Sequence, residues 1–295
     1  MSARIIDGKA IAAQVMQEVA TEVADLRARG VVPGLAVVLV GDDPASASYV
    51  RGKRKACEEL GMRSETVHLP AHTTQSQLLS TIEELCKAGW AHGLLVQLPL
   101  PARIDEKVII EAIPPSMDVD GFHPVNRGRL VSGEDTFVPC TPAGIQELLL
   151  RSGYDPECRH VVIVGRSQIV GLPLAILLAQ KRAGANATVT ICHSRTRNLA
   201  ELTTTADILV AAIGSPSAIR AEMVRAGTVV IDVGVNRVED PSSPKGYRLV
   251  GDVDFAAVSQ IAAAITPVPG GVGPMTIAML MKNTLKAAKA SIAGH

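Results

Sequence analysis

The chain has 295 residues, of which 47% are hydrophobic and 2% aromatic, and 29 basic residues balance 29 acidic ones. This length suits two domains or one large domain, while the neutral charge and scarce aromatic rings argue against a nucleic-acid-binding protein. There is no signal-peptide pattern, no uncharged apolar run near the roughly 18 residues that cross a bilayer, and no paired spacing among the five cysteines. We therefore expect a cytoplasmic protein with reduced thiols, no membrane contact and no metal site.

Helical and strand patterns alternate through the first half of the chain. The short strands are apolar without alternation, which is typical of a parallel sheet covered on both faces. In chain order, the patterns predict a helix over about 8–29, a strand over 35–40, a helix from Pro44 to a cap at Gly61, a strand near 65–69, a helix opened by a capping box of Thr74 and Gln77, and a strand over 93–98.

A second alternating series begins near residue 160, and a domain boundary is predicted near Thr141. The last helix comes after this series, so we expect it to pack back onto the first. The patterns predict strands at 161–164, 188–192, 208–212 and 229–233 with helices between them, a helix over 173–184, caps at Asn198 (with Glu201) and Ser217, a hairpin or loop over 239–246, and a final helix over 277–290.

The helix that begins at Pro44 carries a lysine on its apolar face. At about 100° per residue, Lys53 falls near the middle of one stripe. That stripe consists of Ser46, Tyr49, Val50, Ala56, Cys57 and Leu60. A lysine there is costly unless it is paired or used, and burial in general lets a lysine transfer protons near neutral pH. The alternative is that its ammonium group extends out of the core to solvent.

Polar side chains follow the strands that flank this helix. Tyr49 lies one helical turn from Lys53, Gln97 stands at the end of the strand over 93–98, and Asp120 lies in the Asp-Val-Asp-Gly loop. Ligands of parallel α/β sheets collect at the carboxyl ends of strands, so the four side chains can reach one rim. Gln97 could then hydrogen-bond Lys53, and Asp120 could bind a polar heterocycle. Alternatively, Gln97 only ends a strand and the aspartate loop is an ordinary turn.

The segment over 161–173 is placed where a dinucleotide fold binds phosphate. It follows a strand and opens a helix, where backbone N–H groups and the helix dipole favour an anion. Ser167 and Val170 replace two glycines of the GxGxxG pattern, and Gly171 comes one position later. An ordinary tight turn is the alternative.

The end of the next strand favours NADP over NAD. It reads Cys-His-Ser-Arg-Thr without the acidic residue that usually binds the ribose 2′-hydroxyl. Ser194 and Arg195, with Arg166, could hold a 2′-phosphate instead, although Arg195 also fits a plain surface charge. Near the end of the chain, a segment over 266–276 that is rich in proline and glycine could approach a flat ligand closely, or could serve as a rigid connector.

Together these segments resemble the bifunctional methylenetetrahydrofolate dehydrogenase/cyclohydrolase family. The resemblance covers nearly the whole chain, and its last segment is highly specific. The matching segments are PASASYVRGK (44–53), QLPLP (97–101), DVDGFHP (118–124), PCTP (139–142), GRSQIVG (165–171), VIDVGVN (230–236), GDV (251–253) and PVPGGVGPMT (267–276).

The resemblance implies two α/β domains with a cleft between them. A catalytic, folate-binding domain is expected over 1–140, completed by a C-terminal helix over 275–295, and a Rossmann-like NADP-binding domain with a mostly parallel sheet over 141–274. It further implies an enzyme of one-carbon metabolism and purine biosynthesis that forms homodimers through its nucleotide domains. Such an enzyme oxidises 5,10-methylenetetrahydrofolate with NADP and hydrolyses the methenyl product to 10-formyl-tetrahydrofolate.

The resemblance also implies roles for particular residues. Lys53 is the expected catalytic acid/base, tuned by Gln97, while Tyr49 stacks on the folate and Asp120 binds the pterin. Further expected substrate contacts are Leu98, Pro99, Pro269, Gly270 and Gly273. Expected cofactor contacts are Gly165, Arg166, Ser167, Ile169, Val170, Ser194, Arg195, Gly214, Val233 and Val235.

One residue departs from the family pattern, since Met117 stands where a lysine usually precedes the aspartate loop. Two other functions are left open by the residues alone. A two-domain NADP dehydrogenase of a small hydroxy acid would need a basic clamp, which the Lys53 rim lacks. A nucleotide-binding protein without enzymatic activity would not need Lys53, Gln97 and Asp120.

Overall fold

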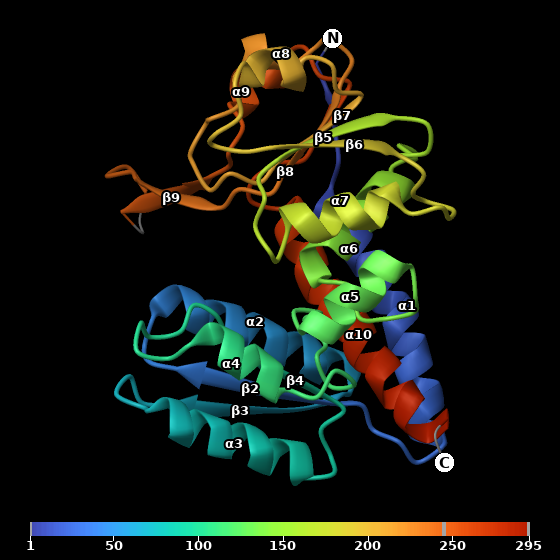
Figure 1. The fold of residues 1–295 in the computed structure, drawn as a ribbon, viewed down its shortest axis with the longest axis vertical. Helices are drawn as coiled ribbons and strands as arrows, with labels where there is room; N and C mark the ends of the chain where they lie inside the picture. Colours follow the sequence, from blue (N-terminus) through green and yellow to red (C-terminus); the bar gives the residue numbers. More distant parts are fainter. Residues whose placement is uncertain (1, 244–245, 294–295) are drawn as a thin grey trace. The chain divides into compact units, whose positions relative to one another are not determined.

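The computed structural model describes residues 2–243 and 246–293, which form two compact units (Figure 1). The six-stranded unit combines the segment up to Ala12 with Thr141–Thr276, and the three-stranded unit combines Ala13–Cys140 with the segment from Ile277 onward. Helices α1 (Gly8–Ala28) and α10 (Val272–Ala293) contribute residues to both units. Among the described residues, no helix is both long enough and apolar enough to span a membrane.

The three-stranded unit has a parallel sheet in the order β3-β2-β4. Its strands are β2 (Gly34–Val40), β3 (Arg63–Leu69) and β4 (Gly93–Val96), and its other helices are α2 (Pro44–Leu60), α3 (Gln75–Lys87), α4 (Glu106–Ala112) and α5 (Pro124–Ser132). Every residue of β2 is buried, and alternate β2 residues share one apolar cluster with α3 and α4. Because β3 and β4 lie on opposite sides of β2, the strand order reverses there, at the kind of position where α/β sheets bind ligands.

Local sequence signals explain where the helices of this unit begin and end. The carboxylate of Asp43 accepts the N–H of Ser46, Pro44 stands in the first turn of α2, and Gly61 ends the helix with a φ of 69°. Thr74 and Gln77 form a reciprocal capping box at α3. These predicted boundaries are confirmed, and they depend only on contacts within a few residues.

The six-stranded unit has a parallel sheet in the order β1-β11-β8-β7-β5-β6. Its strands are β1 (Arg4–Ile5), β5 (His160–Val164), β6 (Thr188–Cys192), β7 (Ile208–Ala211), β8 (Val229–Asp232) and β11 (Ala264–Ile265). The strand order reverses at β5, which lies between β6 and β7, as in Rossmann-like sheets. The predicted α/β class with mostly parallel sheets is confirmed. The N-terminal segment lies in this unit because β1 pairs with β11. β1 has only two residues, so the sequence showed no strand pattern there.

Helices and loops of the six-stranded unit differ in places from the predictions. Helix α6 (Cys140–Arg151) precedes β5, and α7 (Gly171–Ala179) is shorter than the predicted helix over 173–184. Asn198 stands at the predicted N-cap of α8 (Leu199–Thr203), but its side chain donates to Glu201 and makes no cap hydrogen bond. The predicted cap at Ser217 was wrong. Ser217 adopts a φ of 50° ahead of a short 3₁₀ turn, Ala221–Met223. The predicted hairpin is confirmed by the antiparallel pair β9 (Asn236–Glu239) and β10 (Tyr247–Val250), which is followed by α9 (Phe255–Val258).

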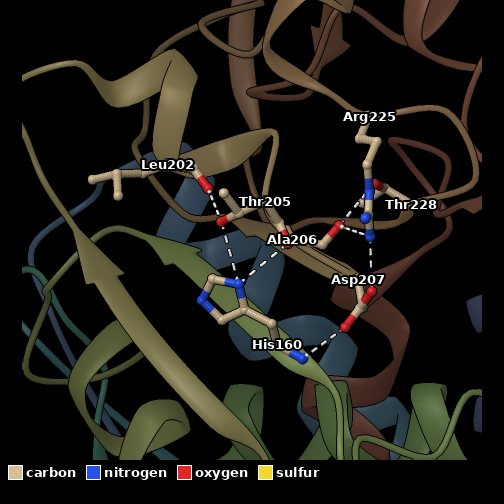
Figure 2. Close-up of polar contacts among 7 residues, drawn as sticks. All are labelled: His160, Leu202, Thr205, Ala206, Asp207, Arg225 and Thr228. Atoms are coloured by element: carbon tan, nitrogen blue, oxygen red, sulfur yellow. Dashed lines mark hydrogen bonds and ion pairs between the residues drawn. The ribbon is translucent and has the colours of Figure 1, made fainter.

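A polar network secures the amino ends of β5, β7 and β8 (Figure 2). The carboxylate of Asp207 accepts the backbone N–H of His160 at 2.9 Å and the guanidinium of Arg225 at 2.8 Å. Arg225 and Thr228 both donate to the carbonyl oxygen of Ala206, at 3.2 and 3.0 Å. The hydrogen bond from the His160 N–H holds the pKa of Asp207 below its ordinary value. The network lies at the edge opposite to the carboxyl ends, where α/β sheets bind ligands, and its hydrogen bonds join three neighbouring strands.

Candidate functional site

Lys53 is buried and hydrogen-bonded to Gln97. Only 9% of the surface of Lys53 is exposed to solvent, and its Nζ donates to Gln97 Oε1 at 3.1 Å. Gln97 directly follows β4; its backbone N–H donates to the carbonyl of Val38 in β2, and its Nε2 donates to the carbonyl of Leu98 at 2.8 Å. The Gln97 amide therefore presents its oxygen to Lys53 and its nitrogen to the carbonyl of Leu98. The predicted pairing at the carboxyl edge of the sheet is thus present.

The faces of α2 agree with the predicted stripe except at Tyr49. The buried residues are Ser46, Val50, Lys53, Ala56, Cys57 and Leu60. On the opposite face, the exposed Arg54 and Lys55 pair with Glu58 and Glu59 one turn later. Tyr49 keeps 50% of its surface exposed, so its expected place on the buried stripe was wrong. Its ring is instead accessible to a ligand, one turn from Lys53.

The aspartate loop runs beside β4. The N–H of Leu94 donates to the carbonyl of Met117 at 2.8 Å, and Asp118 forms a parallel bridge with Leu94. Asp120 is therefore carried toward the end of β4, where it lines a small pocket together with Leu98. The other lining residues are Leu94, Leu95, Val96, Ile109, Ile110, Ile113, Asp118 and Phe122. Met117 is held here through its backbone carbonyl, and its side chain packs against the apolar cluster of β2, α3 and α4.

Asp118 shapes the loop from the inside. Its buried carboxylate accepts the backbone N–H groups of Phe122 and His123, at 3.1 and 2.8 Å, and the side-chain amide of Asn126 at 2.8 Å. Asn126 in turn accepts the hydroxyl of Thr136 at 2.8 Å. Burial raises the pKa of Asp118 to about 6, against the lowering effect of these hydrogen bonds. Both acids of the loop line the pocket, but Asp118 also holds the loop through these three hydrogen bonds.

Cys140 and Asn283 belong to this site although no role was predicted for them. The Cys140 thiol lies 3.5 Å from the carbonyl oxygen of Val119 and 3.9 Å from Asp120 Oδ1. Burial and the charge of Asp120 raise the pKa of Cys140, while the charge of Lys53 acts in the opposite direction. Asn283, from α10, donates to the carbonyl of Val119 at 2.8 Å. Cys140 lies in the PCTP segment, which the sequence analysis had singled out. Asn283 lies within a long helix, where no sequence pattern distinguishes it.

In the six-stranded unit, the turn after β5 has room for glycine only at two positions. Gly165 has a φ of 142°, and a Cβ there would lie 2.2 Å from the carbonyl oxygen of Ala212. A Cβ at Gly171 would lie 2.1 Å from the carbonyl oxygen of Gly165. Ser167, which replaces the middle glycine, accepts the N–H groups of Val170 and Gly171 through its hydroxyl, at 3.1 and 3.4 Å. The exposed turn is therefore a tight strand-to-helix cradle of the kind that accepts a pyrophosphate.

The turn after β6 lies at the same edge, because Val164 and Cys192 are partners in the paired strands. Within it, the N–H of Arg195 donates to the His193 imidazole at 3.1 Å, and the N–H of His193 donates to the hydroxyl of Thr196 at 2.8 Å. Ser194, Arg195 and Arg166 are exposed. The sheet thus brings together the residues predicted to hold the phosphates of NADP.

The other predicted residues lie in several loops of the six-stranded unit, apart from Pro99. Ile169 and Val170 belong to the turn before α7, while Gly214, Val233 and Val235 follow β7 and β8. Pro269, Gly270 and Gly273 belong to the segment that opens α10, in the same unit. Pro99, in the three-stranded unit, follows Gln97 and Leu98. The contacts of Pro269, Gly270 and Gly273 with a folate stay a prediction.

Comparison with known proteins covers both units. Residues 6–120 match the catalytic-domain model of tetrahydrofolate dehydrogenase/cyclohydrolase, and residues 139–292 match its NAD(P)-binding-domain model. The chain is 58% identical over 294 residues, 99% of each chain, to the bifunctional protein FolD of Dehalococcoides mccartyi.

Solved structures agree with this comparison. The bifunctional enzyme FolD of Campylobacter jejuni is 46% identical with a TM-score of 0.92, over 98% of this chain and 100% of that one. The Trypanosoma brucei enzyme, solved in complex with NADP cofactor and an inhibitor, is 44% identical with a TM-score of 0.93 over 99% of each chain. The predicted resemblance is confirmed, and the chain belongs to the tetrahydrofolate dehydrogenase/cyclohydrolase family.

Proposed function

We propose that this protein oxidises 5,10-methylenetetrahydrofolate with NADP and hydrolyses the methenyl product to 10-formyl-tetrahydrofolate. The observation that carries the proposal is the buried Lys53 side chain, which Gln97 holds at the carboxyl edge of the three-stranded sheet. A side chain that can donate or accept a proton is the group that hydrolysis of a methenyl bridge needs. Family membership supports the same pair of reactions.

The cofactor residues fit NADP by their chemistry. The glycine-lined turn at Gly165 and Gly171 lets a pyrophosphate approach the start of α7, with Ile169 and Val170 in the same turn. Arg166, Ser194 and Arg195 supply the charge and hydroxyl that a 2′-phosphate requires. NADP, when bound, accepts the hydride that leaves the methylene carbon of the folate. We propose that Gly214, Val233 and Val235 complete this site.

The three-stranded unit supplies the proton chemistry. We propose that the exposed ring of Tyr49 stacks on the folate, that Asp120 binds the polar edge of the pterin, and that Leu98 and Pro99 line its surroundings, with Pro269, Gly270 and Gly273 as further contacts. In the hydrolysis, water adds to the methenyl carbon and the bond from that carbon to N5 breaks. One proton of the water ends on N5 and one is released, while the formyl group stays on N10. The uncharged amine of Lys53 accepts a proton from the water and returns it to N5, and Gln97 orients Lys53.

The proposal extends to the setting of the enzyme. We propose that residues 1–140 with the C-terminal helix bind the folate, that residues 141–274 bind NADP, and that the protein is a cytoplasmic homodimer. Scattered cysteines without disulfides suit a reducing compartment. The proposed boundary at Thr141 coincides with the first residue of Thr141–Thr276, the longer of the two segments that make up the six-stranded unit.

A substitution at Lys53 tests the proposed function. After mixing with methylenetetrahydrofolate and NADP, the absorbance of NADPH and of the methenyl compound reports both steps. Lys53→Met should reduce hydrolysis by about 10²-fold or more, the usual contribution of a general acid or base, with unchanged circular dichroism. Lys55→Met is the matched control, because Lys55 lies on the exposed face of the same helix, and it should keep the wild-type rates.

Three results would contradict the proposal. Undiminished hydrolysis by the Lys53 variant would remove Lys53 from the mechanism, and an equal loss in the Lys55 variant would show that the effect is not specific to the site. The third is absence of both absorbance signals in the wild-type protein, as expected of a hydroxy-acid dehydrogenase or of a nucleotide-binding protein without enzymatic activity.

A further inference from the structure

Two buried aspartates lie at the carboxyl edge of the six-stranded sheet, apart from the residues assigned to the proposed site. Asp232 is the last residue of β8, and Asp252 follows β10. Asp252 has 0% of its surface exposed and Asp232 has 3%. Buried carboxylates are rare unless hydrogen bonds compensate for the lost hydration, so their partners indicate what they hold in place.

Asp252 accepts hydrogen bonds from the backbone of the loop after β7. Its Oδ2 accepts the backbone N–H groups of Ile213 and Gly214, at 2.6 and 2.8 Å, and its Oδ1 accepts the N–H of Ser215 at 3.0 Å. The same Oδ1 accepts the side-chain amide of Asn236 at 2.8 Å. One carboxylate thus fixes three consecutive peptide groups after β7 and ties them to the first residue of β9.

Asp232 fixes the backbone that carries Asp252. Its Oδ1 accepts the N–H groups of Gly234 and Asp252, at 3.0 and 2.9 Å, and its Oδ2 accepts the N–H of Val253 at 3.0 Å. Its own N–H donates to the hydroxyl of Thr266 at 2.8 Å. The loop after β8 and the segment over 251–253 are therefore joined through one side chain.

Two glycines permit this close approach. A Cβ at Gly251 would lie 1.8 Å from Asp232 Oδ2, and a Cβ at Gly234 would lie 2.2 Å from Asp252 Oδ1. No side chain fits at these distances without displacing a carboxylate. The arrangement explains why glycine stands directly before Asp252 and two residues after Asp232.

The pair is electrostatically coupled. Burial raises the pKa of Asp232 to about 6, and the charge of Asp252 acts in the same direction, while the backbone N–H groups oppose both. Removing one carboxylate would leave several buried N–H groups without an acceptor, which is more disruptive than the loss of one ordinary hydrogen bond.

We propose that Asp232 and Asp252 are positioning residues that hold the loops over 213–215 and 233–236 in the shape that binds NADP. The inference rests on the proposed function, in which Gly214, Val233 and Val235 belong to the cofactor site. These loops follow β7 and β8, at the same edge of the sheet as the phosphate-binding turn after β5. The aspartates act through the backbone and need not touch the cofactor.

Asparagine variants test this role, because the two substitutions should weaken NADP binding to different extents. Both oxygens of Asp252 accept two donors, so Asp252→Asn loses two hydrogen bonds whichever way its amide is turned. At Asp232 only Oδ1 accepts two donors, so Asp232→Asn can lose one. The dissociation constant of NADP, measured by titration calorimetry, should rise by about tenfold or more in Asp252→Asn and by less in Asp232→Asn.

Two readouts separate positioning from a general loss of structure. The KM for NADP should rise more than kcat falls, and hydrolysis of methenyl-tetrahydrofolate, which consumes no NADP, should stay within about twofold of wild type. Asp254→Asn is the matched control: Asp254 caps α9 through the N–H of Ala257 at 3.3 Å, and asparagine caps helices equally well. This control should bind NADP like the wild type.

The outcomes are distinct. A wild-type protein that does not bind NADP refutes the proposed function, whereas a binding wild type with an equally tight Asp252→Asn variant overturns the positioning role alone. A parallel loss of hydrolysis also overturns it, because the aspartates would then support the whole fold. If Asp252→Asn does not fold, the NADP affinity of Asn236→Ala is measured instead, because this variant removes one hydrogen-bond donor to Asp252. An affinity equal to that of the wild type overturns the inference.

Discussion

The buried carboxyl of Asp118 makes the stability of the three-stranded unit depend on pH, and Asp118→Asn should expose this dependence. Three hydrogen bonds favour the charged carboxylate and burial opposes it; burial dominates, and the pKa rises from 3.8 to about 6. Between these values the folded protein keeps a proton that the unfolded chain has released. The free energy of unfolding of the wild type therefore falls as pH rises through this window and levels off above about pH 6.

The size of the effect follows from the shift in pKa. About two pKa units at 1.36 kcal/mol each correspond to roughly 3 kcal/mol for complete titration. About 1.5 kcal/mol of this change in the free energy of unfolding falls between about pH 5 and pH 7.5, because the rest occurs at lower pH. Asparagine does not titrate, and the cost of its altered hydrogen bonds is the same at every pH. The free energy of unfolding of Asp118→Asn should therefore rise relative to wild type by about 1.5 kcal/mol over that interval.

Trp90 offers the assay, because it is the single tryptophan of the chain and belongs to the three-stranded unit. Its ring lies 4.1 Å from the guanidinium of Arg63, so its fluorescence reports unfolding of this unit in urea. His92, whose pKa burial lowers, titrates in both proteins and cancels in the difference. A difference that stays constant with pH, or that changes in the opposite direction, would refute the reasoning, since it would mean that the hydrogen bonds outweigh burial.

Three further predictions concern the nucleotide turn, the sheet and the thiols. Ser167→Ala removes the acceptor for two N–H groups at the start of α7, so the KM for NADP should rise severalfold at nearly unchanged hydrolysis, and equal steady-state constants would contradict this. Asp207→Ala leaves Arg225 and a β5 N–H without their acceptor and should lower the free energy of unfolding by about 1–2 kcal/mol; thermal unfolding identical to wild type would argue against it. Iodoacetamide should label exposed Cys158 in the native protein well before buried Cys140, whose pKa burial raises, and mass spectrometry showing equal labelling would disprove the buried state of that thiol.

Features that depend on nearby residues could be predicted from the sequence. Helix α2 begins and ends where Pro44 and Gly61 indicate, and α3 begins at its capping box, because caps are contacts within one turn of the chain. Strands β2, β4, β5, β7 and β8 were predicted because buried parallel strands are almost uniformly apolar. Lys53 was conspicuous for the same reason, as a charge that interrupts a helical period.

Features that depend on distant partners could not be predicted. Asp118 and Asp120 both line the pocket, yet only packing shows that Asp118 also holds the loop through Phe122, His123 and Asn126. Tyr49 shares the helical stripe of Lys53, but the elements that cover α2 leave its ring exposed. β1 has too few residues for any pattern and is defined by β11 alone.

The sequence by itself thus determined most of the elements, the α/β class and the family, and it pointed to Lys53 as the candidate reactive lysine. Only the tertiary structure showed the other contacts that hold these loops: Asn283 on the carbonyl of Val119, and the carboxylates of Asp232 and Asp252 among backbone N–H groups. The reason is physical. Periodicity and capping are short-range effects that each segment carries alone, whereas a buried polar group is stable only where folding brings donors from distant segments to it.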